Sequence, residues 1–279
     1  MVVLGLLSAL ACAVAYGVAT VLQAVGSRRL AAAEGLDLRF VARLVRSVPY
    51  LLGLALDGAG FLTSIVALRS LPLFLVQSAI ASSVGVTALV AWRWLGTPLH
   101  SREAVALAGL GAGLVMLAVA AEPGSAHPLP AWAQWAALFA VLPMAALAAA
   151  SSRWPANRAA GVLAALAGLG FGGVGVAARA ISVSPPWWHS LASPLAWALA
   201  AHGVLGVYCF AAALQRGSAV VVSGVTFGVE TVVPALIGLA FLGDAVRPGF
   251  GAVAAAGMIL TLLAAVALSR ATDSVEHRA

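Results

Sequence analysis

Two carboxylic acids lie near the middle of long apolar stretches, where a membrane would keep them far from water. Asp57 is the ninth residue of stretch 49–68, and Glu230 lies at the centre of stretch 218–242. Burying an ionisable side chain at that depth costs free energy that helix packing does not require. A carboxyl group there can bind a cation, or exchange a proton for a substrate as its surroundings change. We interpret both as candidate ion- or proton-binding groups; the alternative is a neutral carboxyl that hydrogen-bonds two helices.

The residues that share a helical face with Asp57 are small. Gly53, Asp57, Gly60 and Ser64 recur at i, i+4, i+7 and i+11, so a helix brings them onto one side. We expect these small side chains to leave room around the carboxylate, as a binding site in the membrane requires.

Polar residues elsewhere could complete such a site. Ser223 and Thr226 share a face with Glu230, and Pro234 one turn later leaves a backbone carbonyl free. His202 lies at central depth in stretch 194–214, although a lone histidine in a membrane is often a packed, hydrogen-bonded side chain. Isolated serines and threonines often bond back to their own helix. The candidate binding residues are therefore Asp57, Glu230, His202, Gln77, Ser223 and Thr226.

Signatures of catalysis, of a cofactor and of a resident metal are missing from the sequence. It has no HExxH, no Cys/His cluster and no plausible Ser-His-Asp set. Residues 168–173 match GxGxxG, but they lie inside an apolar stretch, where close helix packing by Gly168 and Gly172 is the better interpretation. We expect no enzyme and no cofactor, and metal ligands only if Asp57 and Glu230 bind a divalent ion. Glu122 and Asp244 follow apolar stretches, and we expect both in solvent.

Composition places these residues in a membrane protein. The 279 residues are 63% hydrophobic and 9% charged, with a mean hydropathy of +1.05. Soluble domains are roughly 45–50% apolar and about 25% charged. A membrane span needs about 20 mostly apolar residues. Nine stretches qualify: 2–25, 49–68, 72–92, 103–121, 131–150, 159–178, 194–214, 218–242 and 249–269.

Arginine placement predicts the orientation, since the chain contains no lysine. With the N-terminus outside and the C-terminus in the cytoplasm, twelve arginines lie inside and three outside, as the positive-inside rule requires. Residues 36–48 are too short and too charged to cross, and we expect an amphipathic helix at the membrane surface. The net charge of +6 therefore reflects topology, because no basic cluster suited to nucleic acid is present.

An internal repeat links the two parts of the chain. Residues 67–68 and 213–214 each carry Ala-Leu at the end of a span, and each next span ends in Leu-Gly, at 95–96 and 242–243. The offset corresponds to five spans, so the second copy is inverted relative to the first, as in many secondary transporters. We expect a repeat over 1–122, a second over 131–270 and a cytoplasmic tail over 271–279.

These segments resemble the drug/metabolite transporter superfamily, which has EamA-type domains. The residues that carry the resemblance are 66–72 with Gln77, and 213–219 with Pro234 and 242–244. The resemblance implies ten spans, five in each half, whereas this chain lacks the second span of the first half. A nine-span plan resembles the NIPA-like magnesium-transporter branch, whose acidic residue four positions before a Phe is matched by Asp57 and Phe61, although its Asn is replaced by Gly60.

We therefore expect an all-α polytopic membrane protein of about nine transmembrane helices in a 4+5 inverted repeat. Its expected function is secondary transport of a small metabolite or drug-like solute across the plasma membrane by alternating access, coupled to protons or ions. The first alternative is a magnesium or divalent-cation permease, and the second is a non-transporting scaffold or a flippase partner. Expected partners are the lipid bilayer and a small solute or ion, with a homodimer as a further option.

Overall fold

The computed structural model describes residues 2–28, 47–95, 100–151, 153–181, 187–217 and 219–276, and these residues are almost entirely helical. The first part of the chain forms α1 (Val2–Arg28), α3 (Val48–Leu68), α4 (Leu73–Ala81), α5 (Ser83–Leu95) and α6 (Ser101–Ala120). The remainder forms β1 (Ala121–Glu122), α7 (Ala131–Phe139), α8 (Val141–Ser151), α9 (Ala156–Ala180), the 3₁₀ helix η1 (Trp187–Ala192), α10 (Pro194–Leu214), α11 (Ala219–Phe241), β2 (Ala245–Val246) and α12 (Gly251–Glu276).

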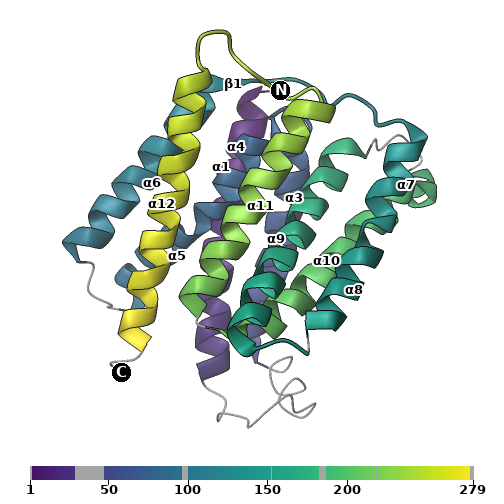
Figure 1. Ribbon diagram of the computed structural model, residues 1–279. Coiled ribbons are helices and arrows are strands. Elements are labelled where there is room, and N and C mark those ends of the chain that lie inside the picture. The colour runs from purple at the N-terminus through teal and green to yellow at the C-terminus, as the bar shows by residue number, and fades with distance from the viewer. Residues whose placement is uncertain are drawn as a thin grey trace.

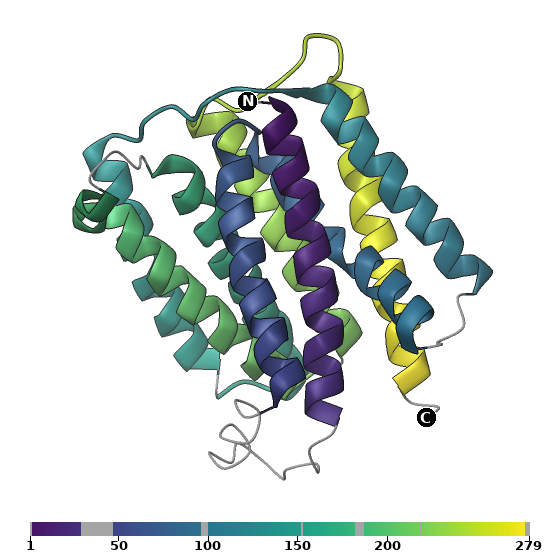
Figure 2. The same ribbon diagram turned by 180° about the vertical axis from the view of Figure 1, so that it is seen from behind.

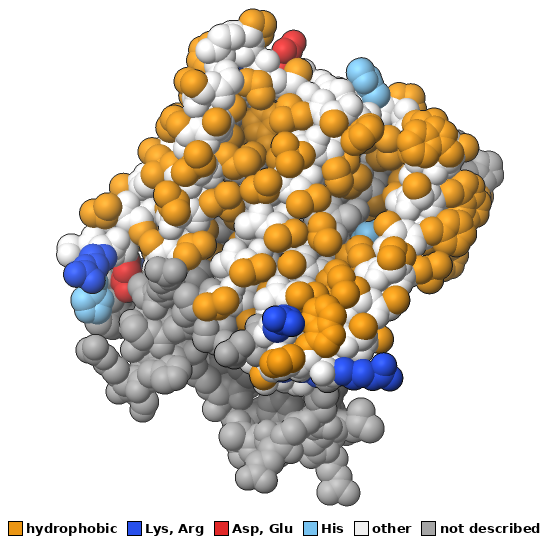
Figure 3. All heavy atoms as spheres, viewed as in Figure 1, with side chains coloured by type: hydrophobic (Ala, Val, Ile, Leu, Met, Phe, Trp, Pro, Cys, Tyr) orange, Lys and Arg blue, Asp and Glu red, His pale blue; other side chains and the backbone are white. Residues whose placement is uncertain are grey.

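These helices confirm an all-α polytopic membrane protein. Within the described residues, nine helical spans are long and apolar enough to cross a bilayer, with α4–α5 and α7–α8 each counted as one span. Hydrophobic side chains cover the flank of the bundle, while the charged ones visible in Figure 3 lie toward its two ends. Such a surface matches a hydrocarbon layer bounded by water on both sides.

Two of the predicted continuous spans are broken. The backbone N–H of Ser82 is shared between the carbonyls of Ser78 and Ala79, and its hydroxyl donates to the Ala79 carbonyl at 2.6 Å. Such local bonds compete with the helical ladder, and α4 ends there. Between α7 and α8 the cause is Pro143, which has no N–H for the carbonyl of Phe139, the last residue of α7.

The helices run along one axis (Figures 1 and 2). α1 begins at the upper end of the bundle in Figure 1, and α12 ends at the lower end, as an odd number of crossings requires. α6 and α12 form one edge, α7, α8 and α10 lie toward the other, and α4, α9 and α11 lie between them. The two ends of the chain lie at opposite faces of the bundle, in agreement with the predicted topology. Which face is cytoplasmic stays a prediction.

Small residues set the helix contacts, as is common in membranes. A Cβ on Gly113 of α6 would lie 2.8 Å from the Gly257 carbonyl of α12, so the two backbones nearly touch. A Cβ on Gly168 of α9 would likewise lie 2.6 Å from the Thr226 carbonyl of α11. Gly228, by contrast, has nothing within 4 Å of its Cβ position, so it makes no such contact.

The described residues include little of one predicted segment and most of another. The surface helix over 36–48 lies outside the described residues except for Ser47 and Val48, and Val48 begins α3. The expected tail over 271–279 is helical as far as Glu276, because α12 continues beyond the apolar stretch. Apolarity marks only the part of a helix that lipid covers, so a helix can extend past it into water.

Candidate functional site

Asp57 lies in the contact between α3 and α1. Its carboxylate accepts a hydrogen bond from the side-chain amide of Gln23 on α1, and the side chain is half-buried. The expectation that Gly53 and Gly60 leave room around the carboxylate is wrong. A Cβ on Gly53 would lie 2.7 Å from the Gln23 side chain, and one on Gly60 would lie 3.2 Å from the Tyr16 ring. The glycines instead allow α1 to approach and deliver Gln23 to the carboxylate.

Glu230 lies on the part of α11 that packs against α9. A Cβ on Gly168 would come within 3.1 Å of the Glu230 backbone nitrogen, and a Cβ on Gly172 within 3.6 Å of its carbonyl oxygen. The half-buried Glu230 side chain forms no hydrogen bond or ion pair with any residue that the structure describes. Among the described residues, its carboxyl group therefore has no protein partner that a proton, a cation or a polar substrate atom would have to displace.

Tyr16 on α1 lies near both carboxyl groups without a hydrogen bond to either among the described residues, and its ring packs beside Gly60, one turn from Asp57 on α3. Its hydroxyl lies close enough to interact electrostatically with both Asp57 and Glu230. The sequence interpretation missed this residue, although a tyrosine at the centre of the first apolar stretch carries a buried hydroxyl that needs a partner. We call Asp57, Tyr16 and Glu230 the midplane group.

The midplane group lies level with the break between α4 and α5. α4 runs antiparallel to α11, and a Cβ on Gly238 would lie 3.2 Å from the Leu73 Cβ. Both helices rise about 1.5 Å per residue, so eight residues after Leu73 on α4 lie at the same depth as eight residues before Gly238 on α11. Glu230 therefore lies level with Ala81 and Ser82. On the other side of the break, a Cβ on Gly17 would lie 2.8 Å from the Ser83 carbonyl, which places its neighbour Tyr16 at the same depth.

Gln77 and Ser78 lie one turn from this break and carry buried polar atoms. The Gln77 side chain packs where Gly175 of α9 leaves space, and its carbonyl oxygen has no hydrogen-bond partner in the described chain. The Ser78 hydroxyl is fully buried and likewise lacks a partner there. An unpaired buried polar group costs about 1–3 kcal/mol, so a ligand that paired with it would gain affinity.

The other predicted residues have structural roles or lie apart. The Thr226 hydroxyl donates to the Ala164 carbonyl of α9 at 3.0 Å, which is a bond between helices. His202 lies 2.9 Å from the Ala137 carbonyl of α7, and its ring fills the space beside Gly173 of α9. Its helix packs against α7–α9 and α11, so His202 is not brought to Tyr16. Ser223 lies on α11, and its side chain is outside the described ones.

The expectation that Asp244 lies in solvent is wrong. Its carboxylate pairs with the Arg179 guanidinium at 2.8 Å, and the two side chains are 0% and 1% exposed. Arg179 also donates to the carbonyls of Leu68 and Gly124, the latter at 2.9 Å. The second carboxylate oxygen accepts the Leu73 backbone N–H at 2.7 Å. Glu122, by contrast, is exposed as predicted.

This ion pair and its partners, here called the latch, tie the two parts of the chain together at the end where α1 begins. The latch joins the end of α9 and the segment after α11 to the turn between α3 and α4. Beside it, β1 pairs with β2 antiparallel, and Arg247 donates to the Ala121 carbonyl at 3.1 Å. Burial of Asp244 could not be inferred locally, because its partner lies 65 residues away.

Comparisons with protein-family models, with curated proteins and with solved structures find no match for this chain. The similarity to drug/metabolite transporters therefore depends on the quoted residues alone and stays a prediction.

Proposed function

We propose that this chain is a secondary transporter that moves a small metabolite or drug-like solute by alternating access, with proton or ion coupling at the midplane group. The observation that carries the proposal is that Tyr16 lies within electrostatic range of both Asp57 and Glu230, at the depth of a helix break. Discontinuous helices line the substrate and ion sites of many secondary transporters, because their broken ladders expose backbone groups there. Gln77 and Ser78 supply unpaired polar atoms one turn away.

Symmetry between the two parts supports the proposal. α3 spans 48–68 and α10 spans 194–214, so both ends are offset by 146 residues (194 − 48 and 214 − 68). α4 and α11 begin with the same offset (219 − 73). α1 packs along α3 and α5, as α9 packs along α10 and α11. We infer that α1 is the counterpart of α9, so the span missing from the first part corresponds to α7–α8, the first of its half, and not to the second span as the sequence comparison implied.

The latch supplies a two-state element for alternating access. Removing one partner of a buried ion pair costs about 3–5 kcal/mol, because the other charge stays buried without a partner. If both groups instead move apart into water, each regains the hydration free energy that it lost on burial. A rocking motion that carried Arg179 away from Asp244 would therefore open this end without leaving a bare charge in apolar surroundings. In the proposed cycle, occupancy and protonation of the midplane group decide which end of the bundle opens.

Proteoliposomes containing a pH-sensitive dye test the proposal. We expect at least one solute in a panel of amino acids, sugars and tetraphenylphosphonium to drive proton flux through the wild type. Glu230→Gln and Asp57→Asn should abolish that flux, while the exposed Glu122→Gln should not. Flux that survives both midplane substitutions would contradict the assigned site, and a non-transporting scaffold predicts no solute-driven flux at all.

A magnesium-sensitive dye in the same liposomes separates the divalent-cation alternative. Mg²⁺ is commonly bound by one or two carboxylates together with several waters, so Asp57 and Glu230 would suffice as protein ligands. A divalent-cation permease is favoured if Mg²⁺ enters, if Asp57→Asn and Glu230→Gln each abolish that entry, and if no solute in the panel drives proton flux. Entry no faster than in empty liposomes would exclude that alternative for this chain.

A further inference from the structure

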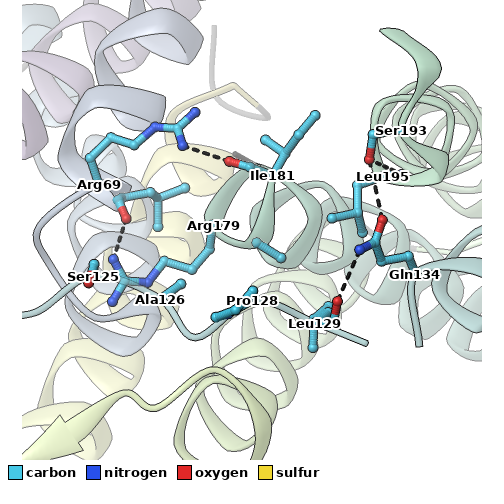
Figure 4. A pocket seen from close by; sticks show the side chains of 12 residues that line it. Arg69, Ser125, Ala126, Pro128, Leu129, Gln134, Arg179, Ile181, Ser193 and Leu195 are labelled. Carbon is cyan, nitrogen blue, oxygen red and sulfur yellow. Dashed lines mark hydrogen bonds between the residues drawn. The ribbon is translucent and has the colours of Figure 1, made fainter. Parts of the chain in front are cut away.

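A pocket of about 270 Å³ lies beside the latch, between the ends of α3, α7, α9 and α10. Figure 4 shows Arg69 and Arg179 on one side of this pocket and Gln134 and Ser193 on the other. The proposed transport function does not use it, because it lies at the end of the bundle, away from the midplane group.

The charge in the pocket comes from Arg69. Arg179 is neutralised by Asp244, and its other donors reach the backbone carbonyls of Leu68 and Gly124. Arg69 donates one hydrogen bond, to the Ile181 carbonyl at 2.6 Å, and meets no carboxylate in the described part of the chain. Within the described residues, four of its five N–H donors therefore have no partner.

The surroundings of Arg69 favour an incoming anion. Partial burial and the neighbouring Arg179 guanidinium both lower the pKa of Arg69, although a guanidinium keeps its proton at neutral pH. No carboxylate among the described residues therefore offsets the free-energy cost of holding this partly buried cation. A guanidinium presents parallel donors that match the two oxygens of a carboxylate.

The rest of the lining limits the ligand to a small, partly apolar molecule. Between the arginines and Gln134 the lining includes Ser125 and several apolar side chains, among them Leu68, Leu129 and Leu195. At the far end, the Gln134 amide donates to the Leu129 carbonyl at 3.0 Å and its oxygen accepts from the Ser193 hydroxyl at 3.5 Å, so both polar side chains already have a partner. The volume lies just below the roughly 300–1,000 Å³ of pockets that hold drug-sized ligands.

We propose that this pocket is a binding site for a short-chain monocarboxylate, with its carboxylate on Arg69 and its hydrocarbon chain against the apolar wall. One negative charge matches the single unneutralised guanidinium. Because Arg69 follows α3 whereas the opposite wall belongs to α7 and the start of α10, a bound anion would bridge the two parts of the chain beside the latch.

Saturation-transfer NMR on the purified protein in detergent tests this site, with butyrate as the probe. We expect butyramide, which has nearly the same shape without the charge, to bind at least about tenfold more weakly. Arg69→Gln should weaken butyrate binding to a similar extent. Arg247→Gln is the matched control, because Arg247 lies exposed at the same end but outside the pocket, and it should leave binding unchanged.

A second variant keeps the test independent of the folding of Arg69→Gln. Ala126→Phe retains both arginines and fills the pocket, so it should abolish butyrate binding while the elution profile stays that of a folded protein. Equal binding of butyrate and butyramide, or full binding to the filled variant, would overturn the proposal. Competition with phosphate tests the assignment to monocarboxylates. If phosphate displaces bound butyrate at a concentration below the one at which butyrate itself binds, that assignment is overturned.

Discussion

Replacing both partners of the latch should destabilise the protein by less than the sum of the two single losses. Asp244→Leu leaves the Arg179 guanidinium buried with only two carbonyl partners, and Arg179→Met leaves the Asp244 carboxylate with only the Leu73 N–H. Each change creates an uncompensated charge in a site that is at most 1% exposed. Each should lower the free energy of unfolding by about 3–5 kcal/mol.

The double variant Arg179→Met/Asp244→Leu contains no such charge. It still loses the partners of two carbonyls and one N–H, and each unsatisfied group costs about 1–3 kcal/mol unless the loops relax toward water. We therefore expect the double variant to be less stable than the wild type, yet more stable than the two single losses predict when added. The coupling energy should be about 2–3 kcal/mol, within the range measured for residues in direct contact.

Denaturant unfolding in detergent micelles, followed by tryptophan fluorescence, measures all four proteins under one condition. The four unfolding free energies give the coupling energy directly. Strictly additive losses would refute the reasoning, since they would mean that the two groups do not sense each other. Single variants as stable as the wild type would refute the burial of the pair itself.

Four further substitutions separate packing from function. Gly168→Ala places a methyl group 2.6 Å from the Thr226 carbonyl, so the melting temperature should fall. Gly228→Ala meets no atom within 4 Å, so its stability should be unchanged or rise by up to about 1 kcal/mol through helix propensity. Equal melting temperatures of the two variants would contradict this. Gln77→Met removes a buried carbonyl without a partner, so the melting temperature should hold or rise while solute-driven flux falls; unchanged flux would exclude Gln77 from the site. Thr226→Val breaks the bond to the Ala164 carbonyl and should cost about 1 kcal/mol of unfolding free energy, with transport reduced no more than stability explains.

Much of the architecture could be predicted because spanning a membrane is a local property of the chain. A run of about 20 apolar residues must satisfy its backbone inside itself, and this alone predicts the nine spans. The depth of Asp57 and Glu230 followed from their position within such runs. The break at Ser82 was not foreseen, because a serine that bonds back to its own helix usually leaves the helix continuous.

The sequence by itself determined which stretches are long and apolar enough to span a bilayer and where along them the two carboxyl groups lie, since each depends on neighbours along one helix. Only the tertiary structure decided that Gln23 binds Asp57, that Tyr16 lies within electrostatic range of both carboxyl groups, and that His202 contacts a different set of helices. It alone buried Asp244 against Arg179. The partner of a buried polar group is set by which helix faces meet, and in lipid that choice depends on small residues and close packing between segments far apart in the chain.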